Sequence, residues 1–346
     1  MKRTTLGRTG IEVSDYCLGT MTWGNQTPEA EAHAQIDAAL AAGIDFMDTA
    51  EMYPVAPKAE TIGNTERVIG NWVQKSGRRD DVVIATKHTG ESALVRDNKP
   101  IGPDTVRDVL EGSLRRLRTD YVDLYQFHWP NRGSFMFRKN WDFDPREQPP
   151  ATQILDEMAA TMEVLGDLVA EGKIRAFGLS NDSAWGTMHW LAAADRAGGP
   201  RVATIQNEYS LLCRLYDTDM AELAHHEDIT LLAFSPLACG FLTGKYQDGD
   251  VPHGSRMSFS ESMGGRNVRS AYEATQAYLD IAARHGLDPV HLALAWCVQR
   301  PFPTIPIFGA TTMAQLETVI AGLDVSLSQE VLDEVSKAHR AHPMPF

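Results

Sequence analysis

The chain has 346 residues, of which 43% are hydrophobic and 23% are charged. This balance excludes a disordered or fibrous protein and allows a sizeable buried core. The formal net charge of −14 argues against a nucleic-acid partner, because phosphate binding needs clustered Lys and Arg, which here are dispersed singly.

No segment predicts a membrane span or a secretory signal. Apolar residues nowhere run for the about 18 positions that a spanning helix needs, and the basic N-terminus lacks an apolar core. The cysteines lack the spacing of zinc ligands, which indicates free thiols and no metal at Cys17, Cys213, Cys239 and Cys297. We expect a cytoplasmic protein with one domain over residues 1–346, since no linker divides the sequence.

The chain begins with two β-prone pieces, residues 2–6 and 11–13, joined by a Gly-rich turn that indicates a hairpin. Apolar segments then alternate with helical patterns eight times. The predicted strands are 16–19, 44–48, 82–86, 122–126, 175–179, 202–205, 230–234 and 304–308. The predicted helices are 29–42, 66–75, 105–117, 154–171, 184–197, 219–226, 272–285 with 289–300, and 313–323, followed by a final helix over 329–340.

The fold that this alternation predicts is an α/β (β/α)8 TIM barrel with an N-terminal β-hairpin and a C-terminal extra helix. Its strands are too continuously apolar for a half-exposed sheet, which favours a closed parallel barrel wrapped in helices. An open doubly wound sheet is the alternative, but it would usually carry a GxGxxG turn after its first strand, and none is present.

Ionisable residues gather where the second, third and fourth strands end, which is where a barrel of this kind carries its working groups. Asp48 ends the second strand with Tyr53 just beyond, Lys87 ends the third, and His128 ends the fourth. A buried Lys87 needs a carboxylate, and Asp48 is its natural partner. The ammonium would make the Tyr53 phenol a better proton donor near neutrality, and His128 could orient a carbonyl.

Each of these residues alone also has a structural interpretation. Asp48 could cap a helix, Tyr53 could be a packing residue of a loop, Lys87 could belong to a structural salt bridge, and a lone histidine such as His128 usually lies in a core. Four such groups on three consecutive strands favour a functional site.

Neutral polar residues end the later strands and suit a bound cofactor. Ser180, Asn181 and Gln206 could hold a carboxamide, and Phe234 could stack on a flat ring. A loop of small residues ending in a lysine could close over a pyrophosphate, through Ser235, Pro236, Leu237, Gly240, Leu242, Gly244 and Lys245. The run from Gly309 to Thr312 enters a helix, where free backbone N–H groups could bind a phosphate. For the glycines, turn chemistry is the alternative.

These motifs resemble the aldo-keto reductase family from end to end. The carriers are Leu6 to Ser14, Leu18 to Gly24, Asp48 to Tyr53, Ala85 to Lys87, Asp123 to His128, Gly178 to Asn181 and Phe234 to Leu237. The loop over 54–65 and the Gly-Ala-Thr-Thr-Met run are most similar to the bacterial NADP(H)-dependent Tas type, which is related to potassium-channel β subunits.

The resemblance implies a reductase of aldehydes and ketones that uses NADPH and direct hydride transfer. Tyr53 would be the general acid, Lys87 and Asp48 would tune it, and His128 would position the carbonyl oxygen. The nicotinamide amide would be held by Ser180, Asn181 and Gln206, with Phe234 stacked on the ring. Further cofactor contacts would come from Gly19, Thr20, Met21, Asp48, Gly309, Ala310, Thr312 and Gln315.

Two departures from the family pattern concern the nucleotide and the rim. Thr318 and Val319 stand where members commonly have an acidic and an amide residue for the adenosine end, so NADH is not excluded. Arg256, supported by Lys245, is the candidate for the 2′-phosphate. The insertion over residues 54–65 lengthens the rim beside Tyr53.

For the substrate we expect a small-molecule carbonyl compound that contacts Trp23, Tyr53 and Trp129. An apolar or aromatic-accepting mouth is indicated by Trp23, Met52, Trp129, Phe135, Phe137, Trp141 and Phe143, with a loop packed on itself as the alternative. The oligomeric state is not predicted. A competing function is an NADP(H)-binding regulatory module whose slow reductase activity is incidental. A Schiff-base enzyme using Lys87 is less favoured, because a lysine paired to Asp48 stays protonated. A metal-dependent hydrolase would need more His and Asp at neighbouring strand ends.

Overall fold

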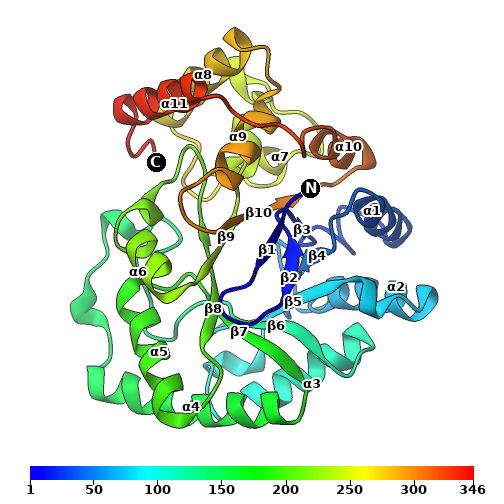
Figure 1. Cartoon of the computed structure of the whole chain (residues 1–346), viewed down its shortest axis with the longest axis vertical. Coiled ribbons are helices and arrows are strands. Elements are labelled where there is room, and N and C mark those ends of the chain that lie inside the picture. Colours follow the sequence, from blue (N-terminus) through cyan, green and yellow to red (C-terminus); the bar gives the residue numbers. More distant parts are fainter.

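The computed structural model describes residues 1–346, and its centre is a closed barrel of parallel strands (Figure 1). The order around the barrel is β3, β4, β5, β6, β7, β8, β9 and β10, which pairs back to β3. This confirms the predicted fold class. The strands are β3 Cys17–Gly19, β4 Phe46–Asp48, β5 Val83–His88, β6 Val122–Phe127, β7 Ile174–Ser180, β8 Val202–Glu208, β9 Thr230–Phe234 and β10 Thr304–Gly309.

Helices surround the strands, as Figure 1 shows, and each predicted helix is present. They are α1 Glu29–Ala41, α2 Asn64–Ser76, α3 Val106–Leu117, α4 Ala151–Ala170, α5 Ala184–Ala197, α6 Asp219–Glu227, α8 Arg269–Arg284, α9 Pro289–Val298, α10 Met313–Ala321 and the final helix α11 Gln329–Ala341. The short helix α7, Arg256–Phe259, was not predicted, because four residues are too few to show a helical period.

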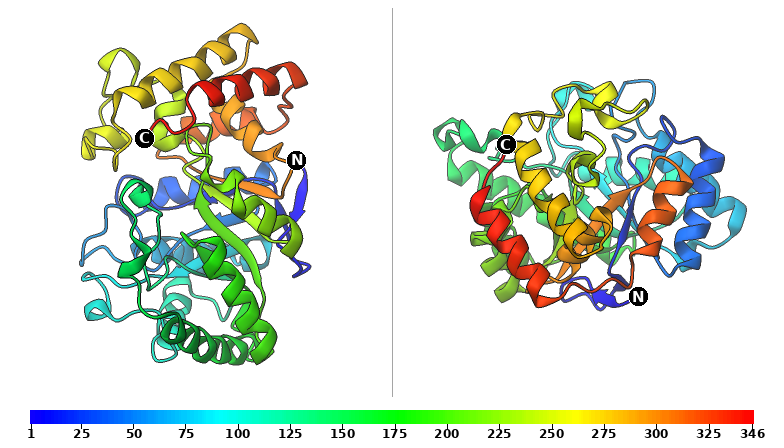
Figure 2. Two further views of the ribbon diagram at one scale, coloured as in Figure 1. Left: turned by 90° about the vertical axis from the view of Figure 1, so that its left-hand side faces the viewer. Right: turned by 90° about the horizontal axis from the view of Figure 1, so that it is seen from above.

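The predicted hairpin closes one end of the barrel. Strands β1, Arg3–Thr5, and β2, Glu12–Ser14, pair antiparallel. At the turn, Gly7 has φ +51° and lies so close to β8 that a Cβ would be 2.8 Å from the Ala203 carbonyl oxygen, which only glycine allows. In the left view of Figure 2 the hairpin lies at one end of the molecule and the long loops at the other. The open end is therefore the one at which the barrel strands finish.

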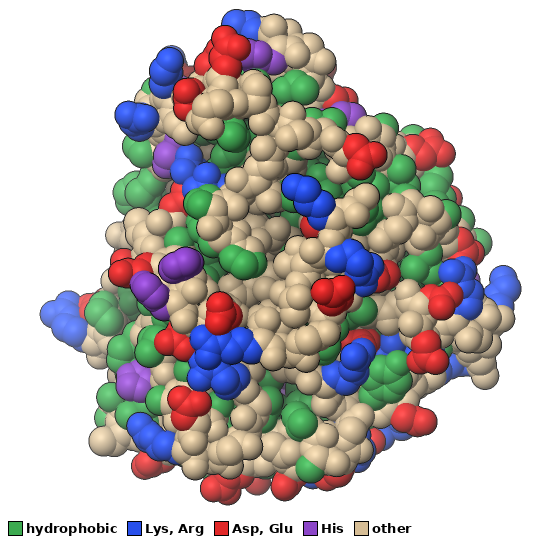
Figure 3. All heavy atoms as spheres, viewed as in Figure 1, with side chains coloured by type: hydrophobic (Ala, Val, Ile, Leu, Met, Phe, Trp, Pro, Cys, Tyr) green, Lys and Arg blue, Asp and Glu red, His purple; other side chains and the backbone are tan.

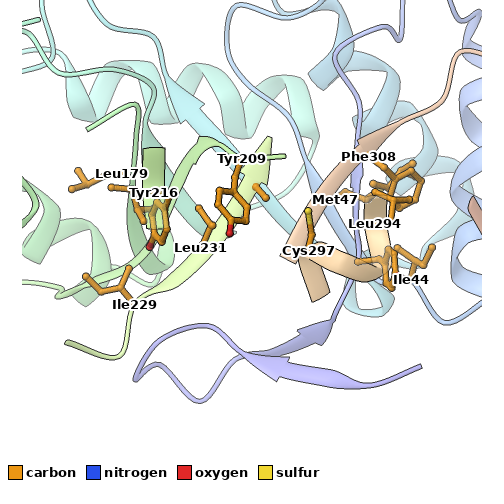
Figure 4. Close-up of a cluster of buried hydrophobic side chains, with 14 of the residues drawn as sticks. Ile44, Met47, Leu179, Tyr209, Tyr216, Ile229, Leu231, Leu294, Cys297 and Phe308 are labelled. Carbon is orange, nitrogen blue, oxygen red and sulfur yellow. The ribbon is translucent and has the colours of Figure 1, made fainter. Parts of the chain in front are cut away.

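Two apolar clusters meet at the barrel wall. The larger one fills the space between strands and helices, and Figure 4 shows part of it with Met47, Phe308 and Leu294. The smaller one lies inside the barrel and joins the hairpin to alternate strand residues such as Phe46 and Ala85. Because side chains alternate along a strand, the next inward positions after Phe46 and Ala85 are Asp48 and Lys87.

Lys and Arg side chains are interspersed with Asp and Glu on the face drawn in Figure 3. No helix combines the length and apolar character needed to cross a bilayer. No group of three or more His, Cys, Asp and Glu side chains is arranged to hold a metal ion.

Candidate active site

Asp48 and Lys87 form a buried ion pair on neighbouring strands, as the sequence predicts. The Lys87 ammonium donates to Asp48 Oδ2 at 2.6 Å and to the Thr49 carbonyl at 2.8 Å. The two side chains are 3% and 0% exposed, Asp48 first. Burial alone lowers the pKa of Lys87, but Asp48 and Tyr53 outweigh it and raise that pKa above its ordinary value. Lys87 is therefore a fixed positive charge at neutral pH.

The Tyr53 hydroxyl lies beside this ion pair. Lys87 Nζ donates to Tyr53 Oη at 3.4 Å and lies 4.8 Å from the ring centroid. Burial raises the pKa of Tyr53 more than Lys87 lowers it, so the pKa is above its ordinary value of 10.0. The expectation of a phenol acidified toward neutrality is wrong, because it counted the charge of Lys87 and neglected burial. Tyr53 is protonated at neutral pH.

His128 follows β6 and completes the group at the open end. Its ring centroid is 5.8 Å from that of Tyr53, with the planes at 77°. Burial, followed by the charge of Lys87, lowers the pKa of His128 well below its ordinary value. The imidazole is therefore neutral, and its buried Nδ1 has no hydrogen-bond partner in the protein. By contrast, His88 points outward between strand and helix, where it contacts Thr105.

Two glutamines hold the other oxygen of Asp48. Gln206 Nε2 donates to Asp48 Oδ1 at 2.8 Å, and Gln126 Nε2 donates to the same oxygen at 3.2 Å. Gln206 thus fixes the carboxylate of the ion pair besides any role toward a cofactor. Gln126 was missed by the sequence argument, although its place two residues before His128 makes it an inward position of the same strand.

Ser180 and Asn181 form a polar wall next to His128. Asn181 Nδ2 donates to the His128 carbonyl at 2.9 Å and to Ser180 Oγ at 3.0 Å. Ser180 Oγ donates in turn to the Gln206 carbonyl at 2.8 Å. Asn181 Oδ1 is buried and has no donor. Because a buried acceptor without a partner is costly, this oxygen is suited to accept from an N–H group of a ligand.

The segment over residues 235–268, which we name the β9 loop, begins after Phe234 and carries two unpaired cations. Lys245 packs on Gly240, where a Cβ would be 2.9 Å from Nζ, and the φ of +99° at Gly240 itself favours glycine. The Arg256 guanidinium makes one hydrogen bond, to the sulfur of Met21 at 3.9 Å, and neither cation has a carboxylate within 4.0 Å. In a chain of net charge −14, two cations without carboxylate partners in one loop suit an anionic ligand. Leu242 is 1% exposed, so its side chain belongs to the core.

The first strand borders the same space. Thr20 donates from both its backbone nitrogen, at 3.1 Å, and its hydroxyl, at 2.8 Å, to the Asp48 carbonyl. Gly19 lies against β10, where a Cβ would be 2.9 Å from the side chain of Ile307. Gly19 and Thr20 therefore hold the floor of the site through the backbone, while Met21 reaches Arg256.

The start of α10 is less open than expected. The Met313 N–H donates to Glu31 Oε1 at 2.7 Å, and the Thr311 N–H donates to Gln315 Oε1 at 2.8 Å. Thr312 caps the helix by accepting from the Gln315 N–H at 3.4 Å. The prediction of free backbone donors over residues 309–312 is wrong at Thr311, and the N–H groups of Met313 and Gln315 just beyond are also occupied, since two local side chains and the distant Glu31 accept from them. Gly309 and Ala310 precede them at the end of β10.

Trp129 lines the open end, whereas Trp23 does not. The Trp129 ring is 4.9 Å from that of His128 and contacts Gly90, where a Cβ would be 2.2 Å from its Nε1. Trp23 is 0% exposed, and its indole N–H donates to Gln35 at 3.2 Å inside the core. The prediction that Trp23 contacts the substrate is therefore wrong. Trp23 follows a strand in the sequence, and that position alone does not show whether the chain turns toward the open end or into the core.

The sequence profile of the aldo/keto reductase family matches residues 16–340. The chain belongs to the aldo/keto reductase family. It is 43% identical to the Tas protein of Escherichia coli, over 100% of this chain and 99% of Tas. A probable voltage-gated potassium channel β subunit of Oryza sativa is 31% identical, over 99% of this chain and 98% of the subunit. An NADH-specific methylglyoxal reductase of Escherichia coli is 28% identical, over 95% of each chain.

Membership makes the protein an NAD(P)H-dependent oxidoreductase of a family that acts on small-molecule carbonyl compounds. One of the relatives is named as NADH-specific, and family membership alone does not fix the nucleotide. Which nucleotide this aldo/keto reductase prefers has to be argued from its own residues.

Two loops shape the open end of this aldo/keto reductase. The insertion over residues 54–65 returns on itself, with the Gly63 N–H donating to the Tyr53 carbonyl at 3.0 Å. The segment over residues 129–150, which we name the β6 loop, is tied to β7 by Ser134, which donates to the Asn181 carbonyl at 2.9 Å. Arg132 in the same loop pairs with Asp182. Sequence spacing did not indicate these ties.

Proposed function

We propose that the protein reduces aldehydes and ketones to alcohols with NADPH, using Tyr53 as the general acid. The observation that carries this proposal is the convergence of Tyr53, Lys87, Asp48 and His128 at the open end of the barrel. NADPH, when bound, supplies a hydride to the carbonyl carbon. Tyr53 donates its hydroxyl proton to the carbonyl oxygen, so that hydride and proton together give the alcohol and NADP⁺.

Lys87 stabilises the negative charge that develops on Tyr53 as its proton leaves. The ammonium is 3.4 Å from the hydroxyl and is already charged, so no reorganisation is needed during the reaction. Asp48 keeps Lys87 charged and fixed. His128 is neutral and can donate a hydrogen bond that orients the carbonyl oxygen toward Tyr53.

The residues of the chain fit the nucleotide at both ends. Asn181 Oδ1, which is buried without a donor, can accept from the carboxamide of a nicotinamide. Lys245 and Arg256 can pair with phosphate oxygens. A 2′-phosphate adds about two negative charges, so two cations without carboxylate partners favour NADPH over NADH. The occupied N–H groups at α10 make the β9 loop the better phosphate site.

Replacement of Tyr53 by Phe tests the proposal. Tyr53→Phe should still bind NADPH, read from its fluorescence, and should reduce 4-nitrobenzaldehyde with a kcat about 100- to 10,000-fold lower. A matched control is Tyr121→Phe, which removes a hydroxyl that donates to Asp80 on the surface. Undiminished turnover by Tyr53→Phe would contradict the assignment. A wild-type turnover below about one per hour against many carbonyls would favour a binding module instead.

A further inference from the structure

Glu208 joins the two loops that border the site. It ends β8, two residues after Gln206, and its side chain is 8% exposed. Its Oε2 accepts from Arg138 Nη1 at 2.8 Å, and its Oε1 accepts from Arg266 Nε at 3.0 Å and Nη2 at 2.5 Å. Arg138 belongs to the β6 loop and Arg266 to the β9 loop. One carboxylate on the rigid barrel therefore serves one arginine from each loop.

The two loops also touch at this point. Arg138 lies over Gly264 of the β9 loop, where a Cβ would be 2.9 Å from Nη2. The two guanidinium groups repel each other when Glu208 is not counted, since burial and then the charge of Arg266 lower the pKa of Arg138. The carboxylate is the only anion within 4.0 Å of either guanidinium. Without it, two partly buried cations would face each other unpaired, and the loops would separate.

Each arm of this contact leads toward the reacting groups. Next to Arg138, the Phe137 ring is 6.3 Å from that of Trp129, which packs on His128. On the other side, Arg266 Nη1 donates to the Met263 carbonyl at 2.9 Å, within the loop that carries Lys245 and Arg256. Glu208 itself contacts neither Tyr53 nor Lys87. Its effect on the reaction would act through the two loops.

We propose that Glu208 is a positioning residue that couples the β6 loop to the β9 loop. When the nucleotide orders the β9 loop, this coupling also orders Phe137 and Trp129 of the β6 loop, which border the substrate space. This inference rests on the proposed function for the placement of NADPH on the β9 loop. Binding of the nucleotide draws Lys245 and Arg256 onto phosphates, Arg266 follows with its loop, and Glu208 holds Arg138 and the adjoining Phe137 in register. A bulky aromatic carbonyl would depend on this coupling, and a small one would not.

Hydrogen exchange of the full-length protein tests the coupling without using activity. In the wild type, NADPH should slow amide exchange in residues 244–268 and also in residues 137–143. In Glu208→Gln, NADPH should still slow the first segment but no longer the second. Arg138→Met should give the same separation, because it cuts the arm to the β6 loop and leaves Glu208 with Arg266. Slowing of residues 137–143 in both variants would overturn the proposal.

Steady-state kinetics give a second readout. Arg138→Met should raise the KM for an aromatic aldehyde by about tenfold and keep its kcat within about threefold of the wild-type value. The KM and kcat for propanal should not change. Equal losses for both aldehydes would indicate general damage and overturn the specificity claim. If Glu208→Gln does not fold, Arg138→Met carries both tests. The two failures can be told apart in the wild-type protein. If the proposed function is wrong, the wild type shows no carbonyl turnover, or NADPH does not slow exchange in residues 244–268. If only the coupling is wrong, both are observed.

Discussion

Lys87 and Asp48 lie 2.6 Å apart in the wall of the barrel, with side chains 0% and 3% exposed. The protein tolerates these two buried charges only together, because the removal of one leaves the other buried without compensation. Two glutamines and the Thr49 carbonyl complete the surroundings. This relationship makes the catalytic group sensitive to conservative changes that a surface ion pair would tolerate.

Asp48→Asn should destabilise the protein by about 3–5 kcal/mol, because a neutral amide leaves the Lys87 ammonium buried without a compensating charge. The measurement is urea unfolding at pH 7. Asp195→Asn is the matched control, since its partner Arg201 is 3.1 Å away at a surface where Asp195 is 65% exposed. That change should stay within about 0.5 kcal/mol. Equal effects of the two substitutions would contradict the uncompensated-charge argument.

The pH dependence of carbonyl reduction should be flat through neutrality and should fall only as the pH approaches the raised pKa of Tyr53. Reduction needs Tyr53 with its proton, and the pKa of Tyr53 is raised above its ordinary value of 10.0. Tyr53 therefore keeps its proton at neutral pH, and activity falls only as the pH rises toward and through the raised pKa. His128 contributes no acid limb near pH 6.5, because its lowered pKa keeps it neutral there. Measurement of kcat/KM from pH 6 to 10 checks this; a fall centred near pH 7 or 8 would contradict it.

Gly70→Ala should destabilise the protein although alanine favours helices by about 1 kcal/mol. In α2, a Cβ at Gly70 would be 2.1 Å from the Arg116 carbonyl oxygen, a backbone atom that cannot move away alone. Gly112→Ala in α3 is the matched control. There the nearest atom is Arg116 Nη1 at 3.2 Å, at the end of a flexible side chain. We expect a lower Tm for the first variant and an equal or higher Tm for the second, by thermal unfolding.

Arg256→Met should raise the Kd for NADPH by about tenfold or more and leave the Kd for NADH nearly unchanged, because a hydrogen bond to a charged group contributes about 1.5–3 kcal/mol. Fluorescence titration with both nucleotides gives the ratio. Arg269→Met removes an arginine that is 92% exposed and pairs with Glu273, and it should alter neither Kd. Equal weakening of both nucleotides would place Arg256 away from the 2′-phosphate.

The barrel and the pairing of Lys87 with Asp48 could be predicted because both follow from short-range rules. Period-two alternation places Asp48 and Lys87 inward, and buried charges require partners. The direction of the pKa shift of Tyr53 could not be predicted, since it depends on burial by a loop, and a loop has no sequence periodicity that shows where its chain runs. The same reason applies to Trp23, which turns into the core.

The ties between loops were also beyond the sequence. Glu208 lies beyond the predicted strand over residues 202–205, and its partners Arg138 and Arg266 are 70 and 58 residues away along the chain. Nothing in the spacing of surface arginines indicates which carboxylate each one meets. The occupied N–H groups of α10 show the same limit, because Glu31 reaches Met313 from a distant helix.

The two ends of the chain differ in how they bear on the open end of the barrel. Met1 lies beside the hairpin at the closed end, with its amino group 3.8 Å from Asp324. The Phe346 ring lies 5.6 Å from the guanidinium of Arg266. A purification tag or a tether to a solid support is therefore best fused before Met1. The same extension after Phe346 would disturb the contact between Phe346 and Arg266, the arginine that holds the β9 loop.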